Sequence, residues 1–210
     1  MTKVLIADDH EIVRRGLKQI LAEAFPNLQV GEAGDARQAL EAARHQTWDI
    51  VLLDINMPGR SGLEVLSELK KEQPRLPIVV LSAFPEEDFA LRSFKLGASG
   101  YVSKQSASDE LLIAVQKAMS GGRYVTAALA EKLASNLAGT APVNAHDDLS
   151  ARELEVLRLV AIGKTLKEIA ADLALSEKTV GTYRRRISDK MGLTTNVELT
   201  RYALQHHLVD

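Results

Sequence analysis

Residues 50–54 read IVLLD, four aliphatic residues followed directly by an aspartate. Two similar runs, VLI at 4–6 and IVVL at 78–81, lie before and after this stretch. Runs that are apolar at every position are typical of strands buried on both faces of a parallel sheet. Weaker strand signals occur at residues 28–30 and 101–102. The sequence therefore predicts five strands in a parallel sheet.

Amphipathic segments separate these runs. Apolar residues recur at helical spacing over residues 11–24, 36–45, 62–72, 86–96 and 107–119. Ser61 followed by Glu64 has the spacing of a capping box at the start of the third segment. Short strands that alternate with helices are typical of right-handed βαβ units. We expect residues 1–120 to form a doubly wound α/β domain with five strands and five helices.

The composition of the 210-residue chain is that of a globular protein, with 46% hydrophobic and 26% charged residues. The chain has no cysteine, which excludes disulfides, cysteine-ligated zinc and thiol catalysis. No apolar run approaches the roughly 18 residues that span a bilayer, and the first residues lack the apolar core of a secretory signal. We expect a cytoplasmic protein with no membrane partner.

Residues 149–210 differ from the rest of the chain in charge and in pattern. They carry 10 Lys and Arg against 8 Asp and Glu, whereas the whole chain has a net charge of −2. They show no strand signal, and an N-cap signature precedes each of four helical segments: Ser150 with Glu153, Thr165 with Glu168, Ser176, and Thr195 with Glu198. We expect a second, smaller, all-α domain of four helices. Residues 121–148 contain one helical segment near 126–138 and a turn-rich stretch at 139–148, so we interpret them as a linker.

Polar side chains follow four of the expected strands. They are Asp8 and Asp9, Asp54, Ser82, and Lys104. In open parallel sheets the carboxyl ends of the strands meet at one edge. Three carboxylates at one edge repel one another, and their oxygen ligands suit Mg²⁺, while a lysine and a hydroxyl suit a phosphoryl group. Taken singly, each acid could be a helix N-cap and the lysine a surface residue; together they predict a phosphoryl site.

Four motifs resemble the receiver domain of bacterial two-component response regulators: VLIADDH at 4–10, DINMPG at 54–59, LSA at 81–83 and GASGYVSK at 97–104. The resemblance covers about residues 1–120 and implies a flavodoxin-like fold. It implies that Asp54 is the phosphoacceptor and that Mg²⁺ lies on Asp9, Asp54 and the backbone carbonyl of Asn56. It also implies that Asp8 holds the ion through water.

The same resemblance implies further roles near the acceptor. Lys104 and Ser82 would bind the phosphoryl oxygens, and Tyr101 would be an aromatic switch that turns inward on activation. Many receivers have proline after the lysine, but this chain has Gln105, so we expect no cis peptide bond there. Ser82 stands where threonine is also common. His10 is interpreted as a residue at a helix start in preference to a ligand, because a hard cation rarely recruits imidazole.

Residues 165–173 and 176–190 are two helical segments with the short break of a helix-turn-helix. The second carries five basic residues, which are Lys178, Arg184, Arg185, Arg186 and Lys190. Such a run is usually a solvated face, but in the second helix of such a pair it favours contact with DNA. Four further motifs resemble the output domain of LuxR-type regulators: LSARELEVL at 149–157, KEIA at 167–170, LSEKTV at 175–180 and KMG at 190–192.

Together the two resemblances imply a response regulator of the NarL/FixJ group. They imply that Thr182 and Arg185 face base edges in the major groove. Lys167, Thr179 and Arg186 would contact phosphates, which position the domain without reading sequence.

Three residues depart from the common LuxR-type pattern, which leaves the operator unassigned. Gly181 stands where lysine or serine is frequent, Tyr183 replaces a frequent histidine and Leu166 replaces a common asparagine. The last helix, with Leu199, Tyr202, Ala203 and Leu204, is by resemblance a dimer face, although an apolar stripe is usually core.

The expected function is that of a phosphorylation-controlled transcription factor. A cognate histidine kinase would phosphorylate Asp54 in a Mg²⁺-dependent transfer, and the activated chain would bind double-stranded DNA as a homodimer. One alternative is a DNA-binding regulator that ignores phosphorylation and keeps the receiver as a structural domain. Another is a phosphohydrolase, but that class needs a general acid two residues after the nucleophile, where this chain has Asn56. We therefore do not expect an enzyme.

Overall fold

The computed structural model describes residues 1–57, 60–83, 86–104, 107–137, 144–206 and 208–209. The chain divides into two compact units, Met1–Thr140 and Ala141–Asp210. Within the described residues, no helix has both the length and the apolar character needed to cross a membrane. Gln105, where no cis peptide bond is expected, lies outside the described residues. Parts of the predicted linker and of the DINMPG motif also lie outside them.

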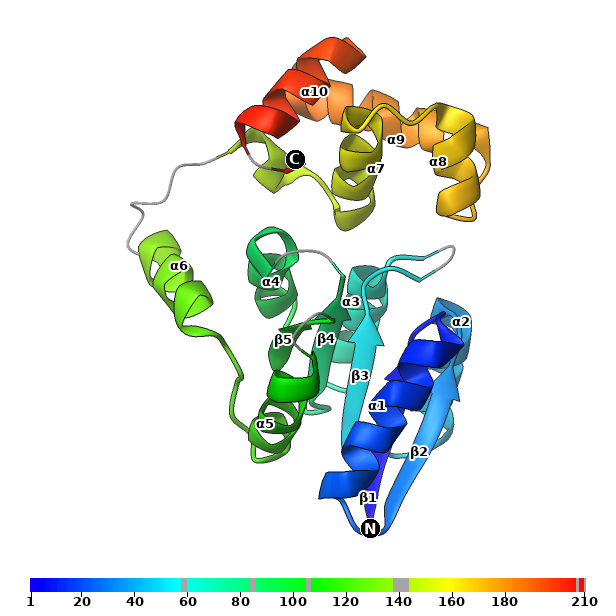
Figure 1. Cartoon of the computed structure of the whole chain (residues 1–210), viewed down its shortest axis with the longest axis vertical. Helices are drawn as coiled ribbons and strands as arrows, with labels where there is room; N and C mark the ends of the chain where they lie inside the picture. Colours follow the sequence, from blue (N-terminus) through cyan, green and yellow to red (C-terminus); the bar gives the residue numbers. More distant parts are fainter. Residues whose placement is uncertain (58–59, 84–85, 105–106, 138–143, 207, 210) are drawn as a thin grey trace. The chain divides into compact units, whose positions relative to one another are not determined.

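The first unit is a five-stranded parallel sheet with strand order β2-β1-β3-β4-β5 (Figure 1). The strands are β1 (Thr2–Ala7), β2 (Leu28–Ala33), β3 (Ile50–Asp54), β4 (Ile78–Ser82) and β5 (Gly100–Ser103). The helices between and after them are α1 (Glu11–Ala24), α2 (Ala36–His45), α3 (Gly62–Glu72), α4 (Glu86–Lys95) and α5 (Ala107–Met119). The predicted doubly wound α/β fold is confirmed. The strand order places a topological switch point between β1 and β3.

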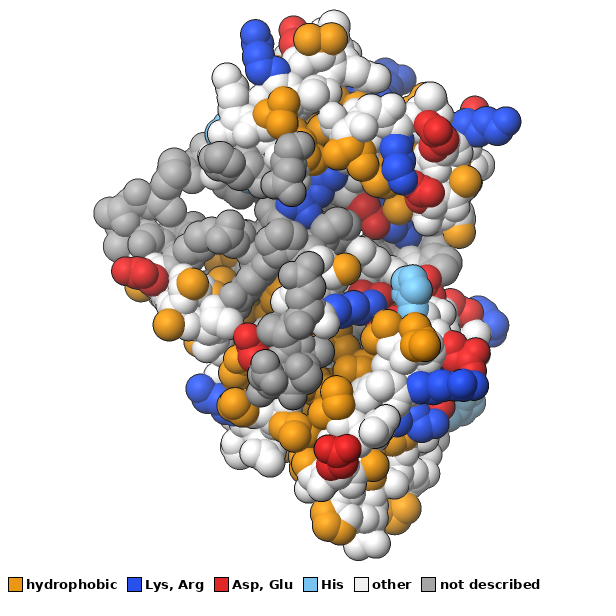
Figure 2. All heavy atoms as spheres, in the orientation of Figure 1, with side chains coloured by type: hydrophobic (Ala, Val, Ile, Leu, Met, Phe, Trp, Pro, Cys, Tyr) orange, Lys and Arg blue, Asp and Glu red, His pale blue; other side chains and the backbone are white. Residues whose placement is uncertain are grey.

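Both faces of the sheet are covered by helices because its central strands are apolar on both sides. One face of the sheet, with Val4, Ile6 and Leu52, packs against α1 and α5 in a single core cluster. Residues of opposite parity, including Leu5 and Leu53, are equally buried and lie on the face that α2, α3 and α4 cover. On the surface, basic and acidic side chains lie side by side over α1 and β2 (Figure 2), as in the pairs that Arg14 and Lys18 make with Glu32.

The start of α3 differs in detail from the prediction. Ser61 is its N-cap, but the serine hydroxyl accepts from the Leu63 N–H, at 3.3 Å, and Glu64 does not complete a capping box. The Glu64 carboxylate instead lies 3.5 Å from Arg60 Nε. The predicted Ser61–Glu64 box was therefore wrong: an arginine one turn away competes for the glutamate.

Beyond α5 the chain stays with the first unit for some distance. The Tyr124 N–H donates to Ser99 O at 2.8 Å, and Tyr124 forms an isolated parallel bridge with Gly100. Helix α6 (Ala127–Leu137) follows and contacts α4. The sequence predicted a helix here, within a linker whose limits remain a prediction.

Among its described residues, the second unit has helices as its only regular secondary structure. A 3₁₀ turn, η1 (Ala145–Asp148), precedes α7 (Ala151–Ala161), α8 (Leu166–Asp172), α9 (Glu177–Met191) and α10 (Asn196–Gln205). The predicted capping boxes form at Ser150, Thr165 and Thr195, each with the glutamate three residues on. Ser176 caps α9 by accepting from the Thr179 N–H at 3.1 Å. The four predicted helices and their starts are confirmed.

Candidate functional site

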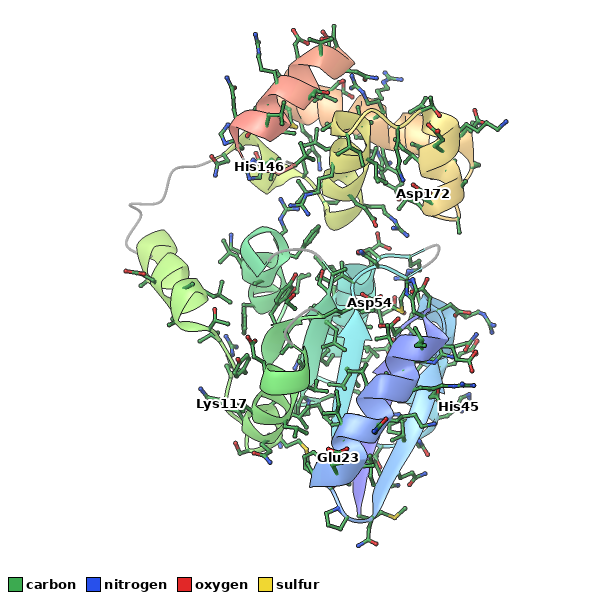
Figure 3. The ribbon with its side chains drawn as sticks, viewed as in Figure 1. Glu23, His45, Asp54, Lys117, His146 and Asp172 are labelled. Atoms are coloured by element: carbon green, nitrogen blue, oxygen red, sulfur yellow. The ribbon has the colours of Figure 1, made fainter. Side chains whose placement is uncertain are left out.

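The candidate site lies at the carboxyl edge of the sheet, where β1 and β3 end side by side. Ala7 pairs with Leu53 in the parallel register, so the residues that follow them are neighbours. Figure 3 places Asp54 at this edge, and Glu23 lies toward the other end of the domain. Asp8 and Asp54 are fully buried, and Asp9 is partly exposed. Ser82 is fully buried at the end of β4, and Lys104 follows β5.

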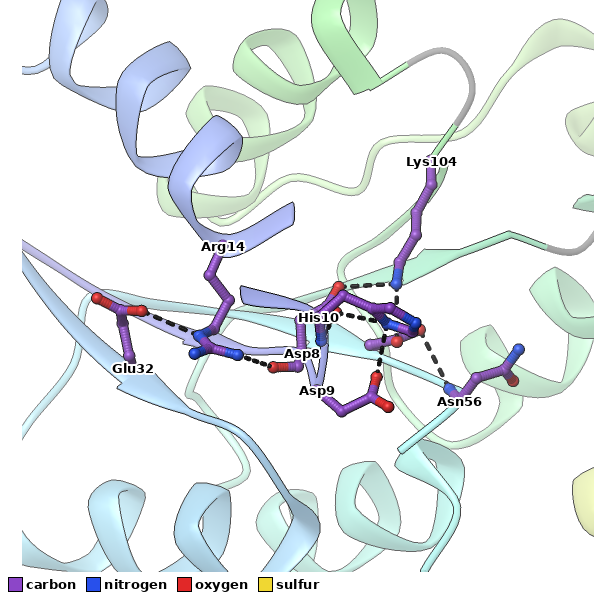
Figure 4. Close-up of polar contacts among 8 residues, drawn as sticks. Asp8, Asp9, His10, Arg14, Glu32, Asn56 and Lys104 are labelled. Atoms are coloured by element: carbon purple, nitrogen blue, oxygen red, sulfur yellow. Dashed lines mark hydrogen bonds and ion pairs between the residues drawn. The ribbon is translucent and has the colours of Figure 1, made fainter. Parts of the chain in front are cut away.

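Lys104 joins two of the acids (Figure 4). Its Nζ donates a hydrogen bond to Asp54 Oδ2 at 2.8 Å. The same nitrogen forms an ion pair with Asp8 Oδ2 at 2.7 Å. Asp54 Oδ1 accepts from the Asn56 N–H at 3.1 Å, and Asp8 Oδ1 accepts from the His10 N–H at 2.9 Å. The two buried carboxylates therefore share one ammonium, and each has a backbone donor on its other oxygen.

The acids are arranged as a cation site would require. Ligand atoms of Asp8, Asp9, His10 and Asp54 all lie within 4.8 Å of one another. Two of the carboxylate oxygens, Asp8 Oδ2 and Asp9 Oδ1, are buried and lack a partner with hydrogen-bond geometry among the described residues. Their nearest polar neighbours are Lys104 Nζ, 2.7 Å from Asp8 Oδ2, and His10 Nδ1, 2.8 Å from Asp9 Oδ1. A single lysine shared by several carboxylates leaves net negative charge, which a bound cation would compensate. The donor set consists mainly of hard oxygens, so these residues fit Mg²⁺.

Burial controls the charges at this site. It raises the pKa of the Asp54 carboxyl, with a further rise from the Asp8 carboxylate, and Lys104 opposes both effects. Burial also acts to lower the pKa of Lys104, but the Asp54 and Asp8 carboxylates outweigh it, and the pKa of the lysine is raised. Lys104 therefore stays protonated, and additional positive charge in the cluster stabilises the ionised form of Asp54.

His10 occupies the N-cap position of α1, as predicted, but its side chain does not cap the helix. Its Nδ1 lies 2.8 Å from Asp9 Oδ1 and 3.4 Å from Asp8 Oδ1. The imidazole is thus a neighbour of the acid cluster as well as a helix-start residue. Tyr101 lies in β5 with 1% of its surface exposed, so its ring is buried in this structure.

Two residues that shape the site carry no signal in the sequence. Arg14, on α1, donates from Nη1 to the backbone carbonyl of Asp8 at 2.8 Å and from Nε to Glu32 at 2.9 Å. Gly62, at the start of α3, donates its N–H to Ile55 O at 2.8 Å. A side chain at Gly62 would place its Cβ 1.9 Å from the backbone carbonyl oxygen of Asp54. Both residues fix backbone next to a buried acid, a role that only the folded structure reveals.

In the second unit, α8 and α9 form the predicted helix pair (Figure 1). Val180 and Ile187 of α9 are fully buried, which turns the opposite face of the helix outward. Thr182, Arg185 and Arg186 are exposed on α9, Thr179 is partly exposed, and Lys167 is exposed on α8. The structure thus leaves all five predicted DNA-contacting residues accessible within this unit.

Two basic residues of α9 have internal roles that their positions in the sequence did not reveal. Arg184 donates from Nη2 to Thr194 O at 2.9 Å and from Nε to Asn196 Oδ1 at 3.0 Å, which ties α9 to the start of α10. Lys190 Nζ lies 2.7 Å from Glu153 Oε2. The run of three arginines therefore contains one structural residue and two accessible ones.

The predicted dimer face on α10 is only partly exposed. Leu199 and Ala203 are fully buried in the core of the unit, and the Tyr202 hydroxyl lies 2.9 Å from His146 Nδ1. Leu204 is exposed, as is Val197, which the sequence analysis did not single out. Leu199 and Ala203 are therefore core residues, as apolar stripes usually are.

Comparison with known proteins covers both units. The family model "Response regulator receiver domain" matches residues 4–116, and "Bacterial regulatory proteins, luxR family" matches residues 147–203. Response regulator GacA of Pseudomonas aeruginosa is 36% identical, over 100% of this chain and 99% of its own length. Response regulator UvrY of Escherichia coli is 34% identical, over 100% and 97%.

A solved structure of the RcsB response regulator of Salmonella typhimurium is 28% identical, with a TM-score of 0.68 over 97% of both chains. A two-component response regulator RcsB–DNA complex is also 28% identical, with a TM-score of 0.58 over 97% of this chain and 98% of that one. The fold, the order of the domains and the full-length relatives agree. The chain therefore belongs to the NarL/FixJ group of two-component response regulators, transcription regulators in which a receiver domain precedes a LuxR-type DNA-binding domain.

Proposed function

We propose that Asp54 accepts a phosphoryl group from the phosphohistidine of a cognate histidine kinase, and that this transfer controls DNA binding. The carrying observation is the contact of one ammonium, Lys104 Nζ, with both buried acids, Asp8 and Asp54. We assign residues 1–120 to the receiver, 121–148 to the linker and 149–210 to the DNA-binding domain. The deep burial of Asp54 favours a reactive carboxylate over a surface acid.

In the transfer, a carboxylate oxygen of Asp54 attacks phosphorus and forms an O–P bond. The N–P bond to the kinase histidine breaks, and the departing imidazole keeps its electron pair. Lys104 then has a phosphoryl oxygen to contact in place of a carboxylate oxygen, and the Ser82 hydroxyl donates to another. Asp8, Asp9, Asp54 and Asn56 would hold Mg²⁺, and the bound ion would supply positive charge that offsets the charge of the phosphoryl oxygens. The contacts of Ser82 and Lys104 with the phosphoryl group bias a two-state receiver in which Tyr101 is the aromatic switch.

The acceptor is tested by intact-protein mass after incubation with acetyl phosphate and Mg²⁺. We expect one added phosphate on the wild-type chain, and none on Asp54→Asn or when a chelator replaces Mg²⁺. An equal adduct on Asp54→Asn would move the acceptor elsewhere and overturn the assignment. Glu23→Gln, which removes an exposed carboxylate of α1, is the matched control for loss of negative charge and should leave the yield unchanged.

We further propose that the phosphorylated chain binds double-stranded DNA as a homodimer through α9. Support comes from the accessible Thr182, Arg185 and Arg186, with Lys167 and Thr179 beside them, and from the match to the luxR family. The exposed Val197 and Leu204 on α10 offer an apolar surface for a second copy.

DNA binding is tested by fluorescence anisotropy on a duplex selected from random sequence, with and without acetyl phosphate. Light scattering on the same samples measures the mass of the assembly. Phosphorylation should tighten binding and double the mass, and Asp54→Asn should do neither. Equal affinity for DNA in all samples would favour the alternative, a phosphorylation-independent regulator with a structural receiver.

A further inference from the structure

A second pocket of the receiver lies at the end of the sheet opposite Asp54. Its volume is about 410 Å³. It is formed where α3 and α5 end and where β4 and β5 begin, with Lys70, Arg75 and Arg123 as its charged residues and Gly97, Gly121 and Gly122 among its backbone. The label of Lys117 in Figure 3 marks the end of α5 close to this region.

The charges of this pocket are all positive. Its lining contains three basic residues and no acidic one. Among the described residues, none of the three basic side chains has a carboxylate within 4.0 Å. The two acids of α3 that precede and follow Lys70, Glu68 and Glu72, are both paired with Arg44, at 2.7 and 2.5 Å. The local carboxylates are therefore engaged away from the pocket.

Lys70 is held in place while its charge remains uncompensated. Its Nζ donates to Leu76 O at 2.7 Å and to Pro74 O at 3.4 Å, which leaves one of its three N–H donors. Its stem lies against Gly97, where a Cβ would come within 3.4 Å of Lys70 Cγ. Burial lowers the pKa of Lys70, and the nearby Arg123 guanidinium lowers it further. Both effects are expected for an ammonium group that no carboxylate compensates.

An adjoining hollow of about 460 Å³ shares Pro74, Arg75 and Pro77 with this pocket. Its other residues include Thr47 and Trp48, the one tryptophan of the chain. Arg75 thus stands between a cationic cavity and a more apolar one. This arrangement suits a molecule with an anionic end and an apolar body.

We propose that this pair of cavities is a binding site for a phosphate monoester. Its phosphate contacts Lys70, Arg75 and Arg123, and its organic body lies against the Trp48 hollow. A dianionic phosphate matches three unpaired cations better than a monocarboxylate does, and the planar guanidinium groups donate two hydrogen bonds to phosphate oxygens. The site is separate from the Asp54 chemistry.

The test is a titration of the full-length chain, in EDTA and at constant ionic strength, with inorganic phosphate and with AMP. Amide resonances of Gly97, Gly121 and Gly122 report the pocket, and that of Gly62 reports the Asp54 end of the domain. We expect saturable shifts of the three pocket glycines and none of Gly62. AMP should bind at least tenfold more tightly than phosphate and should change the fluorescence of Trp48, which phosphate leaves unchanged.

Lys70→Gln and Arg123→Gln should each weaken AMP binding about tenfold, the loss expected for one charge-assisted hydrogen bond. Lys117→Gln, at the same end of α5 but outside the pocket lining, should weaken it less than twofold. Arg123 is exposed, so its substitution does not endanger folding. Linear shifts without saturation, or equal affinity in Arg123→Gln and Lys117→Gln, would overturn the site. Equal binding of phosphate and AMP would overturn its assignment to a monoester.

Discussion

Lys104 Nζ lies 2.8 Å from Asp54 Oδ2, although 50 residues separate them in the sequence. The same nitrogen lies 2.7 Å from Asp8 Oδ2, so one cation compensates two buried acids. In the proposed transfer, the lysine stabilises the acids before phosphorylation, and the same charge is then available to the phosphoryl group. We therefore expect a substitution of Lys104 to have opposite effects on the binding of a cation and on the stability of a phosphoryl dianion at this site.

Lys104→Gln should increase the affinity for Mg²⁺ and reduce the yield of phosphorylated protein. Loss of the ammonium leaves the carboxylates uncompensated, which favours a divalent ion, and it removes a charged donor from the phosphoryl oxygens. We expect Mg²⁺ to bind several-fold more tightly by calorimetry and the acetyl phosphate adduct to fall by about tenfold. Weaker Mg²⁺ binding in Lys104→Gln than in Lys117→Gln would contradict this account.

Gly62→Ala should destabilise the receiver, because the new Cβ would lie 1.9 Å from Asp54 O and 2.8 Å from Ile55 Cα. Backbone must move to accommodate it, at a cost of about 1–3 kcal/mol. Gly16→Ala is the matched control: Gly16 lies within α1 with no atom near its Cβ position, so alanine should add up to about 1 kcal/mol. Urea unfolding followed by Trp48 fluorescence measures the free energy of unfolding of both variants. If both substitutions changed it in the same direction, the predicted clash at Gly62 would be wrong.

Arg184→Ala and Arg185→Ala should separate stability from DNA binding. Arg184 makes two hydrogen bonds to the α9–α10 connection, and their loss should cost about 1–3 kcal/mol in the free energy of unfolding. Arg185 is exposed, with Asp189 at 4.0 Å, so its loss should change stability by less than about 0.5 kcal/mol. It should weaken binding to a selected duplex by about tenfold or more. Circular dichroism measures unfolding and anisotropy measures affinity; a stability loss confined to Arg185→Ala would reverse the assignment.

Glu198 should give the second unit a pH-dependent stability at acidic pH. Hydrogen bonds from the N–H groups of Thr195 and Thr194 lower the pKa of this carboxyl to about 2. Because the folded pKa lies below the unfolded value, the contribution is complete above about pH 4.5 and is lost as the pH falls toward 2. The difference in unfolding midpoint between wild type and Glu198→Gln should be constant near neutral pH and narrow below pH 4.5. A difference that stays constant down to pH 2 would contradict this assignment.

The fold was predictable because its main signals are local. Burial on both faces gives β1, β3 and β4 continuous apolar runs at 4–7, 50–53 and 78–81, and the helices between them keep one apolar stripe. The limits predicted for α1, α2, α3 and α5 are confirmed, and α4 ends one residue earlier than predicted, at Lys95. Three capping boxes formed where the spacing required only residues of the same helix turn.

Other features depend on partners that are distant in sequence or compete locally, so no spacing could predict them. Glu64, expected in a capping box with Ser61, pairs with Arg60 instead. Arg184 hydrogen-bonds to Asn196, which lies beyond the end of its own helix. The strand-end residues could be predicted as a group, since parallel strands share an edge. The contacts of Lys104 with two acids, and that of Arg14 with the Asp8 carbonyl, required the folded sheet.

The side chains at the carboxyl edge of the sheet come from four strand ends, from Asp8 after β1 to Lys104 after β5. No shorter segment of the receiver contains the whole set, and a molecule in which β5 has detached has no lysine beside Asp54. The yield of phosphorylated protein should therefore measure the fraction of chains whose sheet is intact. In a sample that is partly unfolded by urea, the fraction of chains that gain phosphate should follow the folded fraction, and a kinase in the cell would signal only through correctly folded molecules.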